Sequence, residues 1–424
     1  MTIKKQLNLL NQLSVWGLIA ILVIMPFHAF LSVVLGSVFG YQAAFQAWKE
    51  VLFVGLAAIW LYNCVLRKKL LFKFSFTNLT VLAIILLGIG VSIIYRPNLN
   101  GLIFGVKTNL VPLGLFLIAQ AYAADFGDNK LLRLVLLPAL IVSVLAILQV
   151  TVIPYQLLQL IGYNPMTINP LQVIDASSGI ARAFATLGGP NQMGTYMILP
   201  VALALAALIR TKRLVYLPIL AFLLVALGLS FSRSSWLGAI VAITLVLFLF
   251  LPAKFKIIMA ASLAGLVLIG YVLLAPQLSN SNNVVLQNIF LHGQFFSNKT
   301  IGPPDVVRGG ALARGYELFI KQPWGHGLGT AGPASYYSPN QLITENWYLQ
   351  IGYEYGWLGI LAYLVLFGSL VVGWLRQPKT EILIGAAAAL IGILIANLFL
   401  HSWADSSLAL VAFTFFGVIE GRKK

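Results

Sequence analysis

Residues 382–400 read ILIGAAAALIGILIANLFL, a stretch without a single charged side chain. Residues 214–229, LVYLPILAFLLVALGL, repeat the pattern earlier in the chain. Each stretch is continuously apolar and approaches the roughly 20 residues that an α-helix needs to cross a bilayer. Strands of a membrane β-barrel would instead show about ten residues of alternating polarity. The two stretches therefore predict transmembrane helices.

The whole chain has the composition of a membrane protein. Of its 424 residues, 60% are hydrophobic and 9% are charged, and the mean hydropathy is +0.93. No water-soluble fold of this length could bury so much apolar surface. We predict an all-α integral membrane protein that forms one polytopic domain over residues 1–424, with about twelve transmembrane helices. The predicted spans lie at residues 13–36, 46–66, 76–95, 101–123, 131–153, 190–210, 214–231, 235–252, 257–275, 346–374, 380–401 and 403–419.

Basic residues between these spans predict the orientation. They fall alternately on a crowded and a sparse side, and the crowded side holds 18 of the 27 Lys and Arg residues. Cytoplasmic loops carry this excess in membrane proteins, so both termini are expected in the cytoplasm. The net charge of +16 is explained by this topology, because the basic residues are scattered over short loops without an interleaved aromatic surface for nucleic acid. We therefore expect no nucleic-acid partner. The lipid bilayer is an expected partner.

Two segments on the predicted outer side are too long to be plain connectors. They are residues 154–189 and residues 277–345, and the second is a large loop between the ninth and tenth spans. Long ordered loops often carry function. Within the second loop, residues 307–321 predict a short amphipathic helix that could lie on the membrane surface.

Arginines on the outer side need a specific explanation. Arg233 lies in a Ser-Arg-Ser-Ser-Trp sequence, where the serines can cap the next helix and leave a positive dipole end beside a guanidinium. Such a place attracts phosphate, although an arginine reaching to lipid headgroups beside a belt tryptophan would look the same. Arg182 precedes Gly-Gly-Pro190-Asn191 and gives a second possible anion site. A solvated loop arginine is the alternative for Arg182.

The large outer loop offers further polar candidates. Arg308 begins the predicted amphipathic helix, and a solvated helix start is its alternative explanation. His326 lies in the glycine-rich sequence Gly-His-Gly-Leu-Gly that follows Pro323 and Trp324. The four histidines of the chain are far apart in sequence, and the single cysteine rules out a multi-thiol site, so no metal site is expected.

Glu345 and Asn346 open the tenth predicted span from the outer side. One interpretation makes Thr344 the N-cap and Glu345 an acid in the first helical turn. The other makes Glu345 a general base. Glu354 lies nine residues deeper, roughly 13 Å along a helix, so the two acids cannot form a close pair. We assign Glu354 to a structural contact within the membrane.

The order of these motifs resembles the O-antigen ligase and polymerase superfamily, membrane glycosyltransferases of the GT-C type. Residues 180–360 carry the resemblance: Pro190-Asn191 opening a helix, then Ser-Arg233-Ser-Ser-Trp-Leu-Gly, then Arg308 fifteen residues before Pro323, and then Glu345-Asn346 ahead of Glu-Tyr-Gly-x-x-Gly. The resemblance implies a cofactor-free, metal-independent glycosyltransferase of the bacterial cytoplasmic membrane, with its active site on the outer face. Its donor would be an oligosaccharide on polyprenyl diphosphate, and its acceptor a glycan or lipid.

The resemblance also implies roles for single residues. Arg233 and Arg308 would bind the diphosphate, and Glu345 would act on the acceptor hydroxyl. Together with the residue patterns, this predicts inversion at the sugar carbon and further substrate contacts at Arg182, Asn191, Asn346 and His326. Lipopolysaccharide ligases usually carry histidine where this chain has Glu345, so the resemblance favours a polymerase over a ligase.

Two rival functions come from other classes. A transporter or flippase of lipid-linked sugar would need charged or broken-helix features near the bilayer midplane, whereas the polar motifs here gather at the outer face. A noncatalytic membrane scaffold would move no sugar. The sugar, the acceptor, the oligomeric state and partner proteins cannot be predicted from the sequence.

Overall fold

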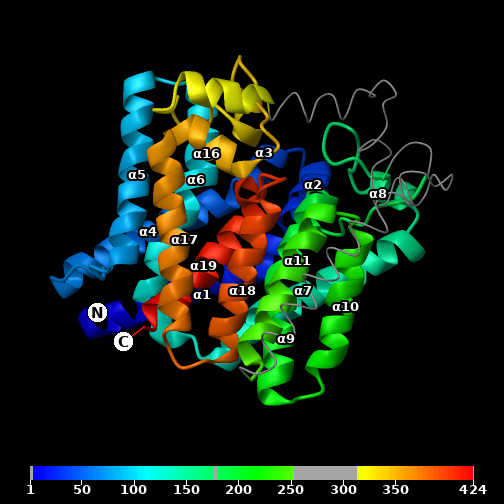
Figure 1. Cartoon of the computed structure of the whole chain (residues 1–424), viewed down its shortest axis with the longest axis horizontal. Coiled ribbons are helices and arrows are strands. Elements are labelled where there is room, and N and C mark those ends of the chain that lie inside the picture. The colour runs from blue at the N-terminus through cyan, green and yellow to red at the C-terminus, as the bar shows by residue number, and fades with distance from the viewer. Residues whose placement is uncertain (1–2, 175–178, 253–312, 424) are drawn as a thin grey trace.

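The computed structural model describes residues 3–174, 179–252 and 313–423, and these residues form a helical bundle without any strand (Figure 1). The predicted ninth span, residues 257–275, and the greater part of the large outer loop lie outside the described residues. The N-terminal half contains α1 (Ile3–Ile24), η1 (Met25–Phe27), α2 (His28–Phe39), α3 (Gln42–Gln46), α4 (Trp48–Arg67), α5 (Phe76–Tyr95), α6 (Leu99–Ala121), η2 (Ala123–Asp125), α7 (Asp128–Thr151) and α8 (Tyr155–Leu160). The C-terminal half contains α9 (Pro190–Thr211), α10 (Tyr216–Leu229), α11 (Arg233–Phe250), η4 (Gly332–Tyr337), α16 (Trp347–Tyr355), α17 (Trp357–Leu375), α18 (Glu381–Ala396), η5 (Ser402–Ala404) and α19 (Ser406–Gly421).

The predicted all-α membrane architecture is confirmed. Among the described residues, 8 helical segments are long and apolar enough to cross a membrane, the first of them running through η1 from Ile3 to Phe39. Three shorter apolar helices, α10, α18 and α19, accompany them. Together these segments coincide with all the predicted spans except residues 257–275.

Two predicted spans are interrupted in the structure. The expected helix 13–36 starts earlier, at Ile3, and is broken by the 3-10 turn at Met25–Phe27. Pro26 lies in that turn and has no N–H to continue the α-helical hydrogen bonds. The expected helix 346–374 is divided into α16 and α17 at Gly356, whose φ of 77° lies in the left-handed region.

Helices α9, α11 and α18 pack closely against one another. Gly238 of α11 and Gly392 of α18 approach so closely that a Cβ on either would meet the other's carbonyl oxygen. Small residues at helix interfaces let backbones approach in this way. The contact fixes the ends of these three helices relative to one another, and those ends carry several of the predicted site residues.

The two ends of the bundle differ in character. Both termini lie at one end (Figure 1), where Lys73 donates hydrogen bonds to the carbonyl oxygens of Gly421 and Lys423, and Arg422 pairs with Asp128. The opposite end carries α2, α3, α8 and α16 (Figure 1). The segments around Arg182 and Glu345 belong to this opposite end.

Candidate active site

Arg182 lies against the turn between α10 and α11. The N–H of Ala183 donates to the carbonyl of Leu229 at 2.9 Å, which holds the backbone in place. The guanidinium then donates from Nε to the carbonyl of Ser230 at 2.9 Å and from Nη2 to Oδ1 of Asn191 at 2.8 Å. Asn191 stands in the first turn of α9, so the structure brings these two predicted site residues into direct contact.

Arg233 is the first residue of α11 and lies three positions after Ser230 of the same turn. The prediction that a serine side chain caps this helix is wrong. Ser232 occupies the N-cap position without accepting a backbone hydrogen bond, and its hydroxyl instead lies 2.8 Å from that of Ser235. The first N–H groups of a helix have no partner within it, so the start of α11 keeps its positive dipole end beside Arg182 and Arg233.

Three buried hydroxyl groups connect α9, α11 and η5. The Thr195 hydroxyl donates to the carbonyl of Asn191 at 2.9 Å, lies 3.0 Å from Ser235 Oγ and accepts from Ser402 Oγ at 3.2 Å. A hydroxyl has one proton to donate and two lone pairs. Because the Thr195 hydroxyl donates its proton to the Asn191 carbonyl, the Ser235 hydroxyl must donate to Thr195 Oγ1 and accept a hydrogen bond from the Ser232 hydroxyl. The hydrogen bonds therefore run in one direction from Ser232 to the first turn of α9.

The same chain of hydrogen bonds continues to the start of α16. The N–H of Ser402 donates to Oδ1 of Asn397 at 2.8 Å. The Asn397 carbonyl accepts from the N–H of Trp347 at 3.1 Å, and Asn346 Nδ2 donates to the carbonyl of Leu398 at 2.8 Å. Segments far apart in the sequence are thus fixed together at one end of the bundle.

Asn346, and not Thr344, caps α16. Its Oδ1 accepts from the N–H of Leu349 at 2.9 Å, while the Thr344 hydroxyl donates to the Asn346 carbonyl. The interpretation with Thr344 as N-cap and Glu345 in the first helical turn is therefore wrong. Glu345 lies just before the helix with φ 49°, a left-handed conformation that non-glycine residues seldom adopt. Backbone conformations of this kind cost of order 1–3 kcal/mol and cluster at functional sites.

His326 docks at the other end of α16. Its N–H donates to the carbonyl of Tyr353 at 2.8 Å, and its ring stacks on that of Tyr353 with centroids 3.7 Å apart. Burial lowers the pKa of His326, partly offset by a hydrogen bond to the Tyr353 carbonyl. Asn346 and Tyr353 are seven residues apart, roughly 10 Å along a helix. The printed contacts of His326 therefore lie at the opposite end of α16 from Asn346.

Glu354 makes the structural contact that the sequence predicts, and the structure identifies its partners. Its carboxylate accepts from Asn109 Nδ2 and from the N–H of Gly329, both at 3.0 Å. Glu354 is fully buried and belongs to the packing of α6 against the glycine turn. It is not available as a second acid beside Glu345.

Other predicted features fall partly outside the described residues. Arg308 lies outside them, as do residues 307–312 of the predicted amphipathic helix; residues 313–321 are helical as expected. Within the described parts of the chain, no group of three or more His, Cys, Asp or Glu residues could hold a metal ion.

Comparison with known proteins supports the resemblance seen in the sequence. A family model described as O-Antigen ligase matches residues 218–364, which include the α10–α11 turn, Arg233 and α16. An O-antigen polymerase of Salmonella muenchen is 25% identical over 336 residues, covering 76% of this chain and 80% of that protein. Both comparisons support similarity to the O-antigen ligase and polymerase superfamily. Together with the apolar helices, they support a multi-pass membrane enzyme of the O-antigen polymerase or ligase type.

The residues that connect the parts of this site carry only a weak signal in the sequence. Thr195, Ser235, Asn397 and Ser402 form the connection, and all of them except Thr195 lie close to a helix break. The available signal was a polar residue within an apolar stretch, since such residues in membrane helices usually face the bundle interior. That signal does not indicate which residue each of these side chains will hydrogen-bond.

Proposed function

We propose that this protein transfers or polymerises oligosaccharide units from a polyprenyl-diphosphate-linked donor at the outer face of the cytoplasmic membrane. The observation that carries the proposal is the continuous hydrogen-bond chain from Arg182 and the start of α11 to the Glu345–Asn346 segment. The arginine proposed to bind the anion and the backbone segment that carries the proposed general base are thereby held by one framework. Glycosyl transfer from a diphosphate needs both.

The diphosphate would be bound at the start of α11. Arg182 and Arg233 supply planar guanidinium groups, which donate paired hydrogen bonds to phosphate oxygens, and the helix start supplies N–H groups. Arg308 is proposed as a third ligand from the outer loop. These groups remain charged as the diphosphate leaves, so they stabilise the charge that develops on it without a metal ion.

Glu345 is proposed as the general base. The acceptor hydroxyl oxygen attacks the anomeric carbon, the carbon–oxygen bond to the diphosphate breaks, and polyprenyl diphosphate leaves with the bonding electrons. The hydroxyl proton passes to the Glu345 carboxylate. Attack opposite the leaving group inverts the configuration at the sugar carbon. Asn346 positions Glu345, because it caps α16 and hydrogen-bonds the Leu398 carbonyl.

Polymerisation is favoured over ligation. The glutamate at position 345, where the ligase-like pattern has histidine, supports it, and so does the relative named O-antigen polymerase, which matches most of the chain. Lipopolysaccharide O-antigen ligase is the alternative within the superfamily. The orientation proposed here, with Arg182 and Glu345 outside, is supported by the basic residues at the end that carries both termini.

One experiment tests the proposal against its rivals. The purified protein in proteoliposomes is incubated with the lipid-linked oligosaccharide of its cell, and the glycans are separated by size. A ladder of repeat units supports a polymerase, and a single transferred chain on an added acceptor supports a ligase. Movement of the lipid across the bilayer without a new glycosidic bond would make the protein a flippase.

A further inference from the structure

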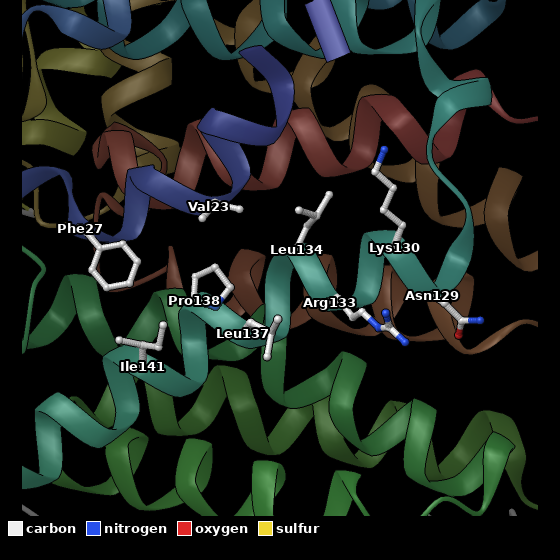
Figure 2. A pocket seen from close by; sticks show the side chains of 9 residues that line it. All are labelled: Val23, Phe27, Asn129, Lys130, Arg133, Leu134, Leu137, Pro138 and Ile141. Atoms are coloured by element: carbon white, nitrogen blue, oxygen red, sulfur yellow. The ribbon is translucent and has the colours of Figure 1, made fainter. Parts of the chain in front are cut away.

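A groove with a volume of about 550 Å³ lies between α1 and α7, away from the candidate active site (Figure 2). One part is apolar and is lined by Val23 and Phe27 on the α1 side and by Leu134, Leu137, Pro138 and Ile141 of α7. Asn129, Lys130 and Arg133 line the other end, where the side chains of Lys130 and Arg133 point to different sides of α7 (Figure 2). Leu137 and Ile141 are about half exposed, so the groove opens on the outside of the bundle.

The polar end of the groove is positively charged. Lys130 and Arg133 both line it, and no acidic residue does among the described residues. The nearest acid in sequence, Asp128, pairs with Arg422 instead. Lys130 donates one hydrogen bond to the carbonyl of Asp125, and an ammonium group has three donors. Both cations therefore keep donors for an anion.

The length of the groove matches one leaflet of a bilayer. Lys130 and Ile141 are eleven residues apart on α7, roughly 16 Å along the helix. Half of the hydrocarbon core of a bilayer is about 15 Å thick. The cations stand near the start of α7, at the end of the bundle where Arg422 pairs with Asp128. An acyl chain that enters beside them would end near the middle of the membrane.

We propose that this groove binds one anionic phospholipid from the leaflet at the end that carries both termini. Its phosphate accepts hydrogen bonds from Arg133 and is attracted by the positive charge of Lys130 at the same end of the groove, and one acyl chain lies along Leu134, Leu137 and Ile141. Basic grooves between transmembrane helices bind anionic headgroups in this way. The inference does not depend on the proposed glycosyl transfer, because the groove shares no residue with the candidate active site.

Native mass spectrometry of the full-length protein tests the proposal, with phosphatidylglycerol and phosphatidylcholine of identical acyl chains as probes. The wild type should retain one phosphatidylglycerol in preference to phosphatidylcholine. Each of Arg133→Gln and Lys130→Gln should reduce that preference about fivefold. The matched control is Lys212→Gln with Arg213→Gln, at the turn between α9 and α10, which should retain the preference. Equal retention of the two lipids by the wild type would overturn the proposal.

Two further measurements test which lipid occupies the groove. Leu137→Trp fills the apolar part while leaving both cations, so it should lower retention of phosphatidylglycerol; unchanged retention would refute an acyl chain in the groove. Undecaprenyl phosphate is added as a competitor. Its displacement of phosphatidylglycerol at equimolar concentration would assign the groove to the carrier lipid and overturn the phospholipid proposal, whereas failure to displace it supports the proposal.

Discussion

Arg182 Nη2 donates a hydrogen bond to Asn191 Oδ1 at a distance of 2.8 Å, which fixes the guanidinium against the first turn of α9. Its Nε is held at the same time by the Ser230 carbonyl. Two of the donors of this arginine thus orient the guanidinium group. Asn191 therefore acts on the proposed diphosphate through Arg182.

Replacing Asn191 should weaken donor binding. Asn191→Ala releases one hydrogen bond to a charged group, so we expect kcat/KM for the lipid-linked donor to fall about tenfold. Asn191→Asp places a carboxylate against Arg182 that competes with the diphosphate, so its loss should be larger. The measurement is donor-dependent turnover in proteoliposomes, with Asn169→Ala in the preceding loop as the control. Equal activity of the Ala and Asp variants would argue against a role for Arg182 in anion binding.

Arg233→Lys keeps the charge at the start of α11 but loses the planar fork. Because contacts to charge that develops in a transition state contribute a few kcal/mol, we expect at least about a tenfold fall in kcat with normal membrane yield. Arg308→Lys should behave in the same way. The matched control is Arg213→Lys at the other end of the bundle. Wild-type turnover in Arg233→Lys would make this residue a lipid headgroup anchor.

The hydroxyl chain predicts a coupling between distant segments. Thr195→Val keeps the shape of the side chain but leaves Ser235 and Ser402 without their acceptor, so it should cost about 1–3 kcal/mol of stability and reduce turnover. Thr195→Ser keeps the hydroxyl and is the control. In a double-mutant cycle with Ser402→Ala, the two losses should not add, because both remove the same hydrogen bond. Thermal unfolding and turnover are measured for all four proteins; strict additivity would contradict the chain.

Local signals in the sequence were sufficient for most helices. The span predicted at residues 76–95 coincides with α5, because Ser75 caps its first turn and an unbroken apolar stretch follows. Pro190 starts α9 as predicted for a proline after two glycines. The contacts of the site follow from packing instead. Ser402 reaches Thr195 across 207 positions of sequence, and Asn109 reaches Glu354 across 245. No periodicity or capping rule specifies such partners.

The start of α16 shows why a local rule can choose the wrong residue. Thr344 and Asn346 are both good N-cap residues, and the modest general preference for asparagine over threonine does not decide between them. The structure uses Asn346 because its amide can also donate to Leu398, which a threonine hydroxyl two residues earlier does not reach. Packing against the end of α18 therefore decides the boundary, and with it the unusual backbone of Glu345.

His326 should make the folded protein sensitive to acid. Burial lowers its pKa below the ordinary value of 6.5 in the folded state, so between the two values the unfolded state binds the proton more readily. The stability contribution is present above pH 6.5 and is lost as the pH falls through the folded-state pKa. His326→Phe keeps the stacking on Tyr353 without a titrating group. Its melting temperature should therefore fall less than that of the wild type between pH 7 and pH 5; parallel curves would contradict the assignment.

Glu345 carries the sharpest prediction, because its backbone and its carboxylate can be tested separately. Glu345→Gln removes the charge but keeps a side chain of the same shape in the left-handed conformation, and a lost general base should cost about 10² to 10⁴ in rate at saturating donor and acceptor. Glu345→Gly relieves the φ of 49°, so it should fold at least as stably as the wild type and still be as slow as Glu345→Gln. Glu345→His, the ligase-like residue, should recover part of the activity with a pH dependence nearer neutrality. If Glu345 had only a structural role in the backbone before α16, Glu345→Gly would instead be both stable and active. The acceptor proton would then have to pass to another group.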